Sequence, residues 1–292
     1  MNDYTNAIEV KGLTKHFDGF SLDNVSFKVP KGSIMGFIGQ NGAGKSTTIN
    51  SILGIIKPDN GEIKVFDREL YANEREIKEN ISAVFDELPF NELLNARSLE
   101  RILKNVFPRW DSSKYHEYLE RFSLPEKKAL GKFSKGMKMK LQIAAALSHN
   151  AKLLIMDEAT TGLDPVVRNE ILDIFMEFLQ DEDHSILMSS HITSDLEKIA
   201  DSVTFIEKGK LLLTGYKDDI LASHGIFKCS KAEYENVDKQ DFISARVTDV
   251  GAELMVSDRK AFAKKYQKGV IDSATLDEIM IYYVNSEKKE WC

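Results

Sequence analysis

Cysteine is almost absent from this sequence of 292 residues. The only two, Cys229 and Cys292, lie far apart and form no ligand-spaced cluster. A disulfide framework is therefore not expected, and this usage is typical of a protein of the reducing cytosol.

Long hydrophobic runs are also missing. No stretch approaches the roughly 20 apolar residues that a membrane helix needs, and the most apolar runs, such as residues 153–156, have the length of a strand. The first residues lack the basic and apolar regions of a signal peptide. We therefore expect a chain that is neither secreted nor membrane-spanning, and any link to a membrane must come through a partner.

An excess of basic residues is absent as well. The sequence has 39 Lys and Arg against 46 Asp and Glu, which gives a net charge of −7. Domains that bind nucleic acid are usually basic, so we expect no nucleic-acid partner. The hydrophobic fraction of 42% and the charged fraction of 29% fit an ordinary globular protein.

The hydrophobic pattern predicts an α/β fold. Strand-like runs occur at residues 7–10, 22–29, 34–38, 153–156, 185–188 and 203–206. Apolar residues with helical spacing separate the later runs, for example Val167, Ile171, Ile174 and Phe178. Buried strands that alternate with amphipathic helices indicate a largely parallel central sheet.

Two other regions differ from this pattern. Residues 88–149 read as almost entirely helical and are predicted to be a helical insertion in a domain formed by residues 1–221. Residues 222–292 are predicted to form a small α/β domain, in which Ile243, Ala245 and Val247 alternate as on a strand. Thr275 and Glu278 there form a capping box before an apolar helix.

A glycine-rich loop follows the run at residues 34–38. It consists of Gly39, Gln40, Asn41, Gly42, Ala43, Gly44, Lys45 and Ser46 and fits the pattern G-x-x-x-x-G-K-[ST]. Glycines let backbone N–H groups approach phosphate oxygens closely, and the following helix adds its positive N-terminus. Lys45 can bind the β- and γ-phosphates, and the Ser46 hydroxyl can bind Mg²⁺. The loop predicts a nucleoside triphosphatase.

Two acids end the run at residues 153–156. Asp157 can hold the Mg²⁺ shell, and Glu158 can orient or deprotonate the attacking water. A solvated strand end would explain such a pair on its own. With the phosphate loop upstream, the catalytic interpretation is favoured.

With these motifs in place, residues 7 to about 221 resemble the ABC ATPase family. Phe133-Ser134-Lys135-Gly136-Met137 is similar to the family signature, and Thr161-Gly162-Leu163-Asp164 is similar to the D-loop. Phe17 and His191 resemble the adenine-stacking aromatic and the switch histidine. The resemblance implies a P-loop NTPase core of the ABC type, with a mixed sheet, an antiparallel β subdomain and a helical insertion.

The resemblance also implies roles for individual residues. ATP would be sandwiched between two subunits, with Ser134, Gly136 and Asp164 of one subunit facing nucleotide held by the other. Thr47 would join the phosphate loop in binding nucleotide, and His191 would sense the γ-phosphate. Simpler alternatives are a core aromatic for Phe17, a helix N-cap for Ser134 before a helix that begins at Met137, and a structural histidine for His191.

The sequence departs from the family pattern at three positions. Asp86 stands where the family has a glutamine that touches Mg²⁺, and no glutamine lies between Gln40 and Gln142. As a hard oxygen ligand, Asp86 is still a candidate for the metal, beside Ser46 and Asp157. Lys135 and Met137 replace a glycine and a glutamine of the signature.

The variant signature resembles that of type-2 ABC exporters, which move peptides, antibiotics and other amphipathic cargo outward. The expected partners are a separate transmembrane permease and a second ATPase subunit, either another copy or a paralogue. The expected location is the cytoplasm, at the inner face of the membrane. The alternatives are an importer ATPase and a non-transport ABC ATPase of translation or DNA repair.

Overall fold

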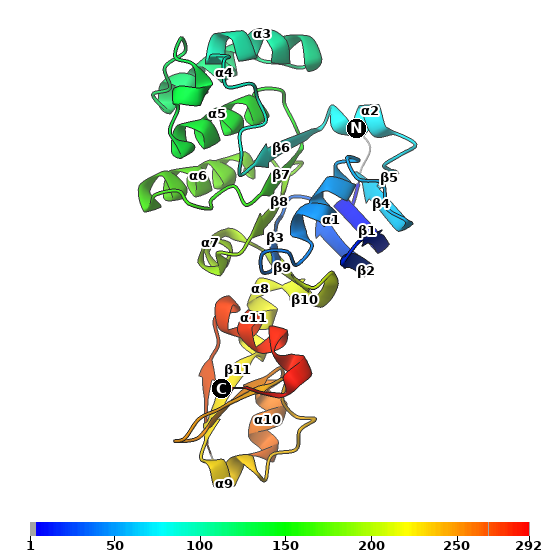
Figure 1. Ribbon diagram of the computed structural model, residues 1–292, viewed down its shortest axis with the longest axis vertical. Coiled ribbons are helices and arrows are strands. Elements are labelled where there is room, and N and C mark those ends of the chain that lie inside the picture. Colours follow the sequence, from blue (N-terminus) through cyan, green and yellow to red (C-terminus); the bar gives the residue numbers. More distant parts are fainter. Residues whose placement is uncertain (1–3, 268, 292) are drawn as a thin grey trace.

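The computed structural model describes residues 4–267 and 269–291. The molecule is elongated, and the sheet formed by the last part of the chain lies at the end opposite α3 (Ala96–Val106) and α4 (Ser112–Arg121), whereas the other two sheets lie side by side (Figure 1). This arrangement separates the part with the phosphate loop from the C-terminal part.

The central sheet has the strand order β10-β9-β3-β8-β7-β6. Its strands are β3 (Ile34–Ile38), β6 (Ile81–Phe85), β7 (Leu153–Asp157), β8 (Ser185–Ser190), β9 (Ser202–Glu207) and β10 (Lys210–Tyr216). Every pairing is parallel except that of β10 with β9. The prediction of a largely parallel central sheet is confirmed.

Both faces of the central sheet are covered, because side chains of adjacent strand residues point to opposite faces. In β7, Leu154 and Met156 pack into a cluster with the helices α5, α6 and α7, whereas Leu153 and Ile155 pack into a second cluster with α1. These helices are α1 (Lys45–Ile52), α5 (Lys135–Leu147), α6 (Pro165–Phe178) and α7 (Thr193–Ile199). The continuous apolar runs in the sequence reflect this burial on both sides.

A second sheet, antiparallel, carries the N-terminal part of the chain, as the sequence predicts. Its order is β2-β1-β4-β5. The strands are β1 (Asn6–Phe17), β2 (Phe20–Pro30), β4 (Asn60–Val65) and β5 (Arg68–Glu69), and the short helix α2 (Glu74–Lys78) follows them. This sheet shares its hydrophobic cluster with α1, so it lies against the phosphate loop.

The helical region is less continuous than the sequence suggested. It contains α3 (Ala96–Val106), α4 (Ser112–Arg121), the 3₁₀ turn Leu130–Lys132 and α5, but residues 86–95, 107–111 and 122–129 are not helical. Asn95 and Asp111 cap α3 and α4, and Pro108 and Pro125 lie in the connections. Capping residues and prolines favour such interruptions.

The third sheet, with the order β14-β11-β13-β12-β15, forms the C-terminal part together with α8 to α11. The elements are α8 (Lys217–Ser223), β11 (Gly225–Cys229), α9 (Lys231–Tyr234), β12 (Ala245–Val247), β13 (Ala252–Val256), α10 (Arg259–Lys265), β14 (Val270–Ser273), α11 (Leu276–Val284) and β15 (Glu290–Trp291). Ile243 lies just before β12, and the predicted capping box at Thr275 is present.

The C-terminal part contacts α7, the helix that follows His191. The N–H of Leu276 donates to the Glu197 carboxylate at 2.6 Å, and the Thr193 hydroxyl lies 3.5 Å from the Asp277 carboxylate. Leu276 and Ile279 also share one hydrophobic cluster with Leu196 of α7. The third sheet is therefore packed onto the rest of the chain.

Asp183 joins the turn before β8 to two other segments. Its carboxylate lies 2.5 Å from Lys31 and 2.9 Å from Lys152. Hydrogen bonds from these two lysines lower the pKa of Asp183 to about 2. The carboxylate therefore stabilises the fold at pH values above its ordinary pKa, and this contribution is lost as the pH falls towards 2.

We expect Asp183→Asn to lower the free energy of unfolding by about 1 kcal/mol at pH 7, because the partly exposed pair is screened by water. Urea unfolding of both proteins at pH 7 and pH 3 measures the difference, which should shrink at the lower pH. Asp181→Asn, at a more exposed acid two residues earlier, is the control. A difference that is equal at both pH values would contradict the ion-pair explanation.

Candidate functional site

The phosphate loop joins β3 to α1 and needs glycine at two positions. A Cβ atom on Gly39 would lie 2.4 Å from the carbonyl oxygen of Ile206. Gly44 has a φ of +114°, and its Cβ would lie 2.7 Å from a methyl group of Leu22. The loop is therefore folded closely against β9 and β2, while Asn41, Gly42 and Ser46 are exposed.

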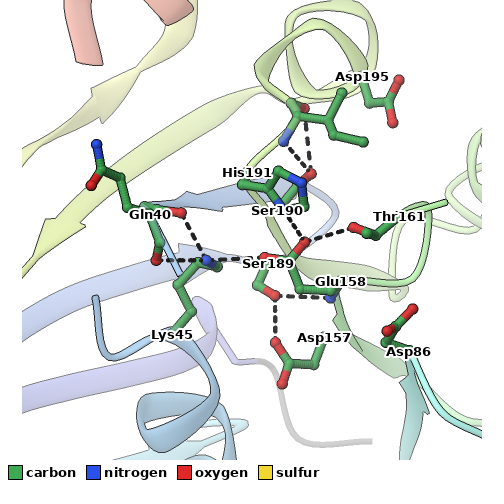
Figure 2. A network of polar contacts seen from close by, with 12 residues as sticks. Gln40, Lys45, Asp86, Asp157, Glu158, Thr161, Ser189, Ser190, His191 and Asp195 are labelled. Carbon is green, nitrogen blue, oxygen red and sulfur yellow. Dashed lines mark hydrogen bonds and ion pairs between the residues drawn. The ribbon is translucent and has the colours of Figure 1, made fainter. Parts of the chain in front are cut away.

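Lys45 is buried at the start of α1, and its ammonium group has three oxygen partners. Its Nζ donates to the carbonyl oxygens of Gly39 at 2.7 Å and Gln40 at 3.1 Å. Nζ also lies 3.0 Å from Oε1 of Glu158 (Figure 2). The two residues that the sequence assigns to phosphate binding and to catalysis are therefore in direct contact.

Glu158 follows β7 with a φ of +55°, a left-handed conformation that is uncommon for residues other than glycine. Its Oε2 accepts a hydrogen bond from the Thr161 hydroxyl at 2.8 Å and lies 2.7 Å from Nδ1 of His191. Burial raises the pKa of Glu158, but the hydrogen bonds from Thr161 and Lys45 and the nearby charges outweigh burial and lower it. The carboxylate is thus held in its ionised form.

Asp157 and Glu158 are both positioned by Ser189, a residue that the sequence interpretation missed. The Ser189 hydroxyl donates to Oδ1 of Asp157 at 2.6 Å and accepts from the Glu158 N–H at 3.1 Å. Asp157 and Ser189 are paired across the parallel strands β7 and β8. The sequence could have indicated Ser189, because the two parallel strands both end in polar residues, and the carboxyl ends of neighbouring parallel strands lie side by side.

The donor set suits Mg²⁺. The part of the chain that the structure describes has no cluster of three or more His, Cys, Asp or Glu able to hold a metal ion. Mg²⁺ is usually held by one or two carboxylates together with substrate phosphates and water. The Asp157 carboxylate, at the carboxyl end of β7, and the exposed Ser46 hydroxyl at the start of α1 match this requirement.

Phe17 ends β1 and is 44% exposed, so the alternative of a core aromatic is wrong. Its ring stacks on Phe20 with 6.4 Å between the centroids. An exposed ring at the end of the antiparallel sheet is available to a flat ligand.

The signature residues lie at the start of α5. α5 starts at Lys135, two residues earlier than predicted, and the Ser134 hydroxyl accepts from the Met137 N–H at 3.3 Å as its N-cap. Asp164 caps α6. The polar partners of Lys45 are Gly39, Gln40 and Glu158, and neither Ser134 nor Gly136 is among them.

Comparisons with known proteins agree with this geometry. The ABC transporter family model matches residues 22–161. The bacitracin transport ATP-binding protein BcrA of Bacillus licheniformis is 39% identical over 208 residues, which are 70% of this chain and 68% of the relative. This chain belongs to the ABC transporter ATP-binding proteins.

Two further proteins are similar to this ABC ATPase. The lantibiotic transport ATP-binding protein SrtF of Streptococcus pyogenes is 35% identical over 209 residues, which cover 70% of this chain and 89% of the relative. A solved structure described as an ATP-binding subunit of an ABC transporter has a TM-score of 0.67 at 28% identity, covering 74% of this chain and 92% of its own. The chain is an ATP-hydrolysing subunit of a transporter.

Asp86 has a partner in this ABC ATPase that the sequence interpretation did not predict. Its Oδ1 lies 2.5 Å from Nζ of Lys135. Figure 2 shows no polar contact between Asp86 and the other labelled residues, Asp157 included. The metal-binding role of Asp86 therefore stays a prediction. Its carboxylate pairs with the first residue of α5, the helix that begins within the signature.

Among the described residues of this ABC ATPase, no helix has both the length and the apolar character needed to cross a bilayer.

Proposed function

We propose that this ATPase drives the export of peptides, antibiotics or other amphipathic molecules through a separate membrane permease. The contact of Lys45 with Glu158, and of Glu158 with His191, is the observation that carries the ATPase mechanism. The outward direction is supported by the Ser-Lys-Gly-Met form of the signature and by similarity to bacitracin and lantibiotic transport proteins.

Nucleotide binding is assigned to the phosphate loop. The first N–H groups of α1 have no partner within the helix, and together with the loop they favour phosphate oxygens. Lys45 would exchange Glu158 for the more highly charged γ-phosphate. Ser46 and Asp157 would hold Mg²⁺, which neutralises phosphate charge when it is bound.

Water activation is assigned to Glu158. Released from Lys45, its carboxylate keeps the Thr161 hydroxyl and His191 as partners and is ionised, as a general base must be. His191 would then link Glu158 to the γ-phosphate. Ser189 keeps Asp157 and Glu158 in a fixed relative position.

The second half of each site is assigned to a second subunit, either another copy or a paralogous ATPase. Ser134, Gly136 and the start of α5 form a helix N-terminus, which would bind the γ-phosphate of nucleotide held by the other subunit. Asp164 lies at the start of α6, in the loop that also carries Thr161. Two subunits placed head to tail would bring each signature to the partner's nucleotide.

An apolar groove is assigned to the permease. Its volume is about 510 Å³. It is lined mainly by apolar residues, including Ile55, Phe85, Pro89, Phe90, Val106 and Phe107. Ile55 and Val106 are exposed, and Phe85 directly precedes Asp86. An apolar helix of the permease fits this surface and would place the ATPase at the inner face of the membrane, in the cytoplasm.

We expect Phe17→Ala to weaken ATP binding about tenfold, because stacking of a base on an aromatic ring contributes roughly 1–3 kcal/mol. Titration of a fluorescent ATP analogue measures the affinity, and Phe17→Trp should retain it. The Phe17→Ala substitution should weaken GTP binding by a similar factor, since stacking does not select the base. Equal affinity of the wild type and Phe17→Ala would remove Phe17 from the nucleotide site.

Transport in reconstituted vesicles tests the export proposal. The ATPase and its permease are placed in vesicles with the ATPase outside, and a labelled peptide antibiotic and ATP are added outside. Export from the cytoplasmic side predicts accumulation inside the vesicles, with none for Glu158→Gln. ATP-dependent release of preloaded cargo would instead show an importer, and no permease-dependent movement of any cargo would refute the proposal.

A further inference from the structure

Asp86 and Lys135 are both departures from the family pattern, and the structure joins them in one ion pair. The distance between Lys135 Nζ and Asp86 Oδ1 is 2.5 Å, and each side chain is about two-fifths exposed. Asp86 directly follows β6, whereas Lys135 is the first residue of α5. The pair therefore links two segments that are far apart in the sequence.

Lys135 also lies against a third segment. A Cβ atom on Gly162, in the loop between β7 and α6, would lie 3.3 Å from Lys135 Nζ. The same loop carries Thr161, which binds Glu158, and Asp164, which caps α6. The ammonium group of Lys135 thus sits where the segment after β6, the signature and the D-loop meet.

Electrostatics favours this pair. The first turn of α5 has no acidic residue but contains Lys135 and Lys138, and cations are unfavourable at a helix N-terminus. The missing negative charge comes from residues 86–95: Asp86 pairs with Lys135, and Glu92 lies 2.5 Å from Lys138. The beginning of α5 therefore depends on acids of the preceding segment.

Hydrogen bonds between a side chain of α5 and the backbone of β6 also hold these two elements together, deeper in the molecule. The buried Gln142 side chain of α5 accepts from the Phe85 N–H at 3.1 Å and donates to the Phe85 carbonyl oxygen at 3.0 Å. α5 is thus attached to the end of β6 both at Phe85 and at Asp86. A displacement of this strand end must also displace the start of α5.

We propose that Asp86 and Lys135 are positioning residues that couple the segment after β6 to the signature loop. Phe85, the last residue of β6, and Pro89 and Phe90 on the segment after it line the groove assigned to the permease. The ion pair transmits their position to Ser134 and Gly136, which face the second subunit's nucleotide. This inference rests on the proposed function, because only a second subunit gives the signature a nucleotide to bind.

The first test measures ATP-dependent dimerisation in a Glu158→Gln background. Asp86→Asn and Lys135→Gln should each weaken the dimer roughly tenfold, since an exposed pair contributes up to about a factor of five per site and a dimer has two sites. The reciprocal exchange Asp86→Lys/Lys135→Asp should restore most of the loss. Lys135→Gln should leave the ATP affinity of the separate subunit unchanged.

Glu92→Gln is the matched control, because it breaks an ion pair of the same length on the same helix without touching Lys135. It should weaken the dimer by less than either single substitution at the pair. If both single variants weaken the dimer and the reciprocal exchange does not restore it, the two residues act separately and the proposal is wrong. A loss of Mg²⁺-dependent ATP affinity in Asp86→Asn alone would assign Asp86 to the metal instead.

A second test needs neither nucleotide nor a second subunit. Hydrogen exchange of residues 133–138 in the nucleotide-free protein should be a few-fold faster in Asp86→Asn and return to the wild-type rate in the reciprocal exchange. Unchanged exchange would overturn the coupling. If the Glu158→Gln protein does not dimerise, a homodimer is excluded and the dimerisation test must use the paralogous partner subunit, while hydrogen exchange still decides whether the pair holds the signature loop.

Discussion

Glu158→Gln is expected to bind ATP but to hydrolyse it slower by a factor on the order of 10²–10⁴, the usual cost of losing a positioned general base. The amide keeps the size of the side chain and a hydrogen-bonding oxygen for Thr161, but it cannot accept the proton of water. The γ-phosphate is then retained, so the protein should accumulate as an ATP-bound dimer. Phosphate release and gel filtration with ATP measure the two effects.

Glu170→Gln is the control for this substitution, because Glu170 is an acid of α6 that pairs with Lys140 outside the site. Its phosphate release should equal that of the wild type. A kcat of Glu158→Gln close to the wild-type value would show that another group activates the water. A slow variant that stays monomeric at every concentration would instead exclude a homodimer and point to a paralogous partner subunit.

Lys45→Ala is expected to reduce ATP affinity by at least about 30-fold, because loss of a buried charged hydrogen-bonding partner costs about 2–5 kcal/mol. The substitution also removes the cation from Glu158 and the donor from the Gly39 and Gln40 carbonyls. Part of the loss therefore comes from a less ordered loop. Isothermal titration with Mg²⁺ and ATP measures the affinity.

Lys57→Ala, at an exposed lysine beyond α1, is the matched control and should bind ATP normally. Circular dichroism separates loss of binding from loss of folding. Pairing Lys45→Ala with Glu158→Gln removes the unpaired carboxylate, so this double variant should be more stable than Lys45→Ala alone. Near-normal ATP affinity of a folded Lys45→Ala protein would contradict the assigned phosphate site.

The sequence predicted the place of the candidate site residues in the fold where these residues are close in the chain or follow a strand. The phosphate loop is local, so its motif determines both its shape and its position before α1. The placement of Asp157, Glu158 and His191 followed from one rule, since the carboxyl ends of parallel strands share an edge of the sheet. The contact between Lys45 and Glu158 agrees with that rule.

Contacts that depend on tertiary packing could not be predicted. Nothing in the neighbourhood of Asp86 indicates that its partner is Lys135, because the pairing depends on how α5 docks on β6. The helical pattern of residues 88–149 likewise concealed the non-helical stretches at residues 88–95, 107–111 and 122–129. Periodicity identifies which residues are buried, but not where a capping residue or a proline interrupts the helix.

The packing of the C-terminal part onto α7 has a thermodynamic consequence. One continuous hydrophobic cluster contains Leu196 of α7 and Ala200, which follows this helix, together with Ile226, Leu276 and Ile279 of the C-terminal part. Regions that share a core melt cooperatively, and a ligand that binds only the native state stabilises everything that melts with its site. At ATP concentrations of about 100 times Kd, this amounts to about 2.7 kcal/mol. We therefore expect ATP bound at Lys45 to protect the distant sheet β14-β11-β13-β12-β15 from heat and proteases, without touching it.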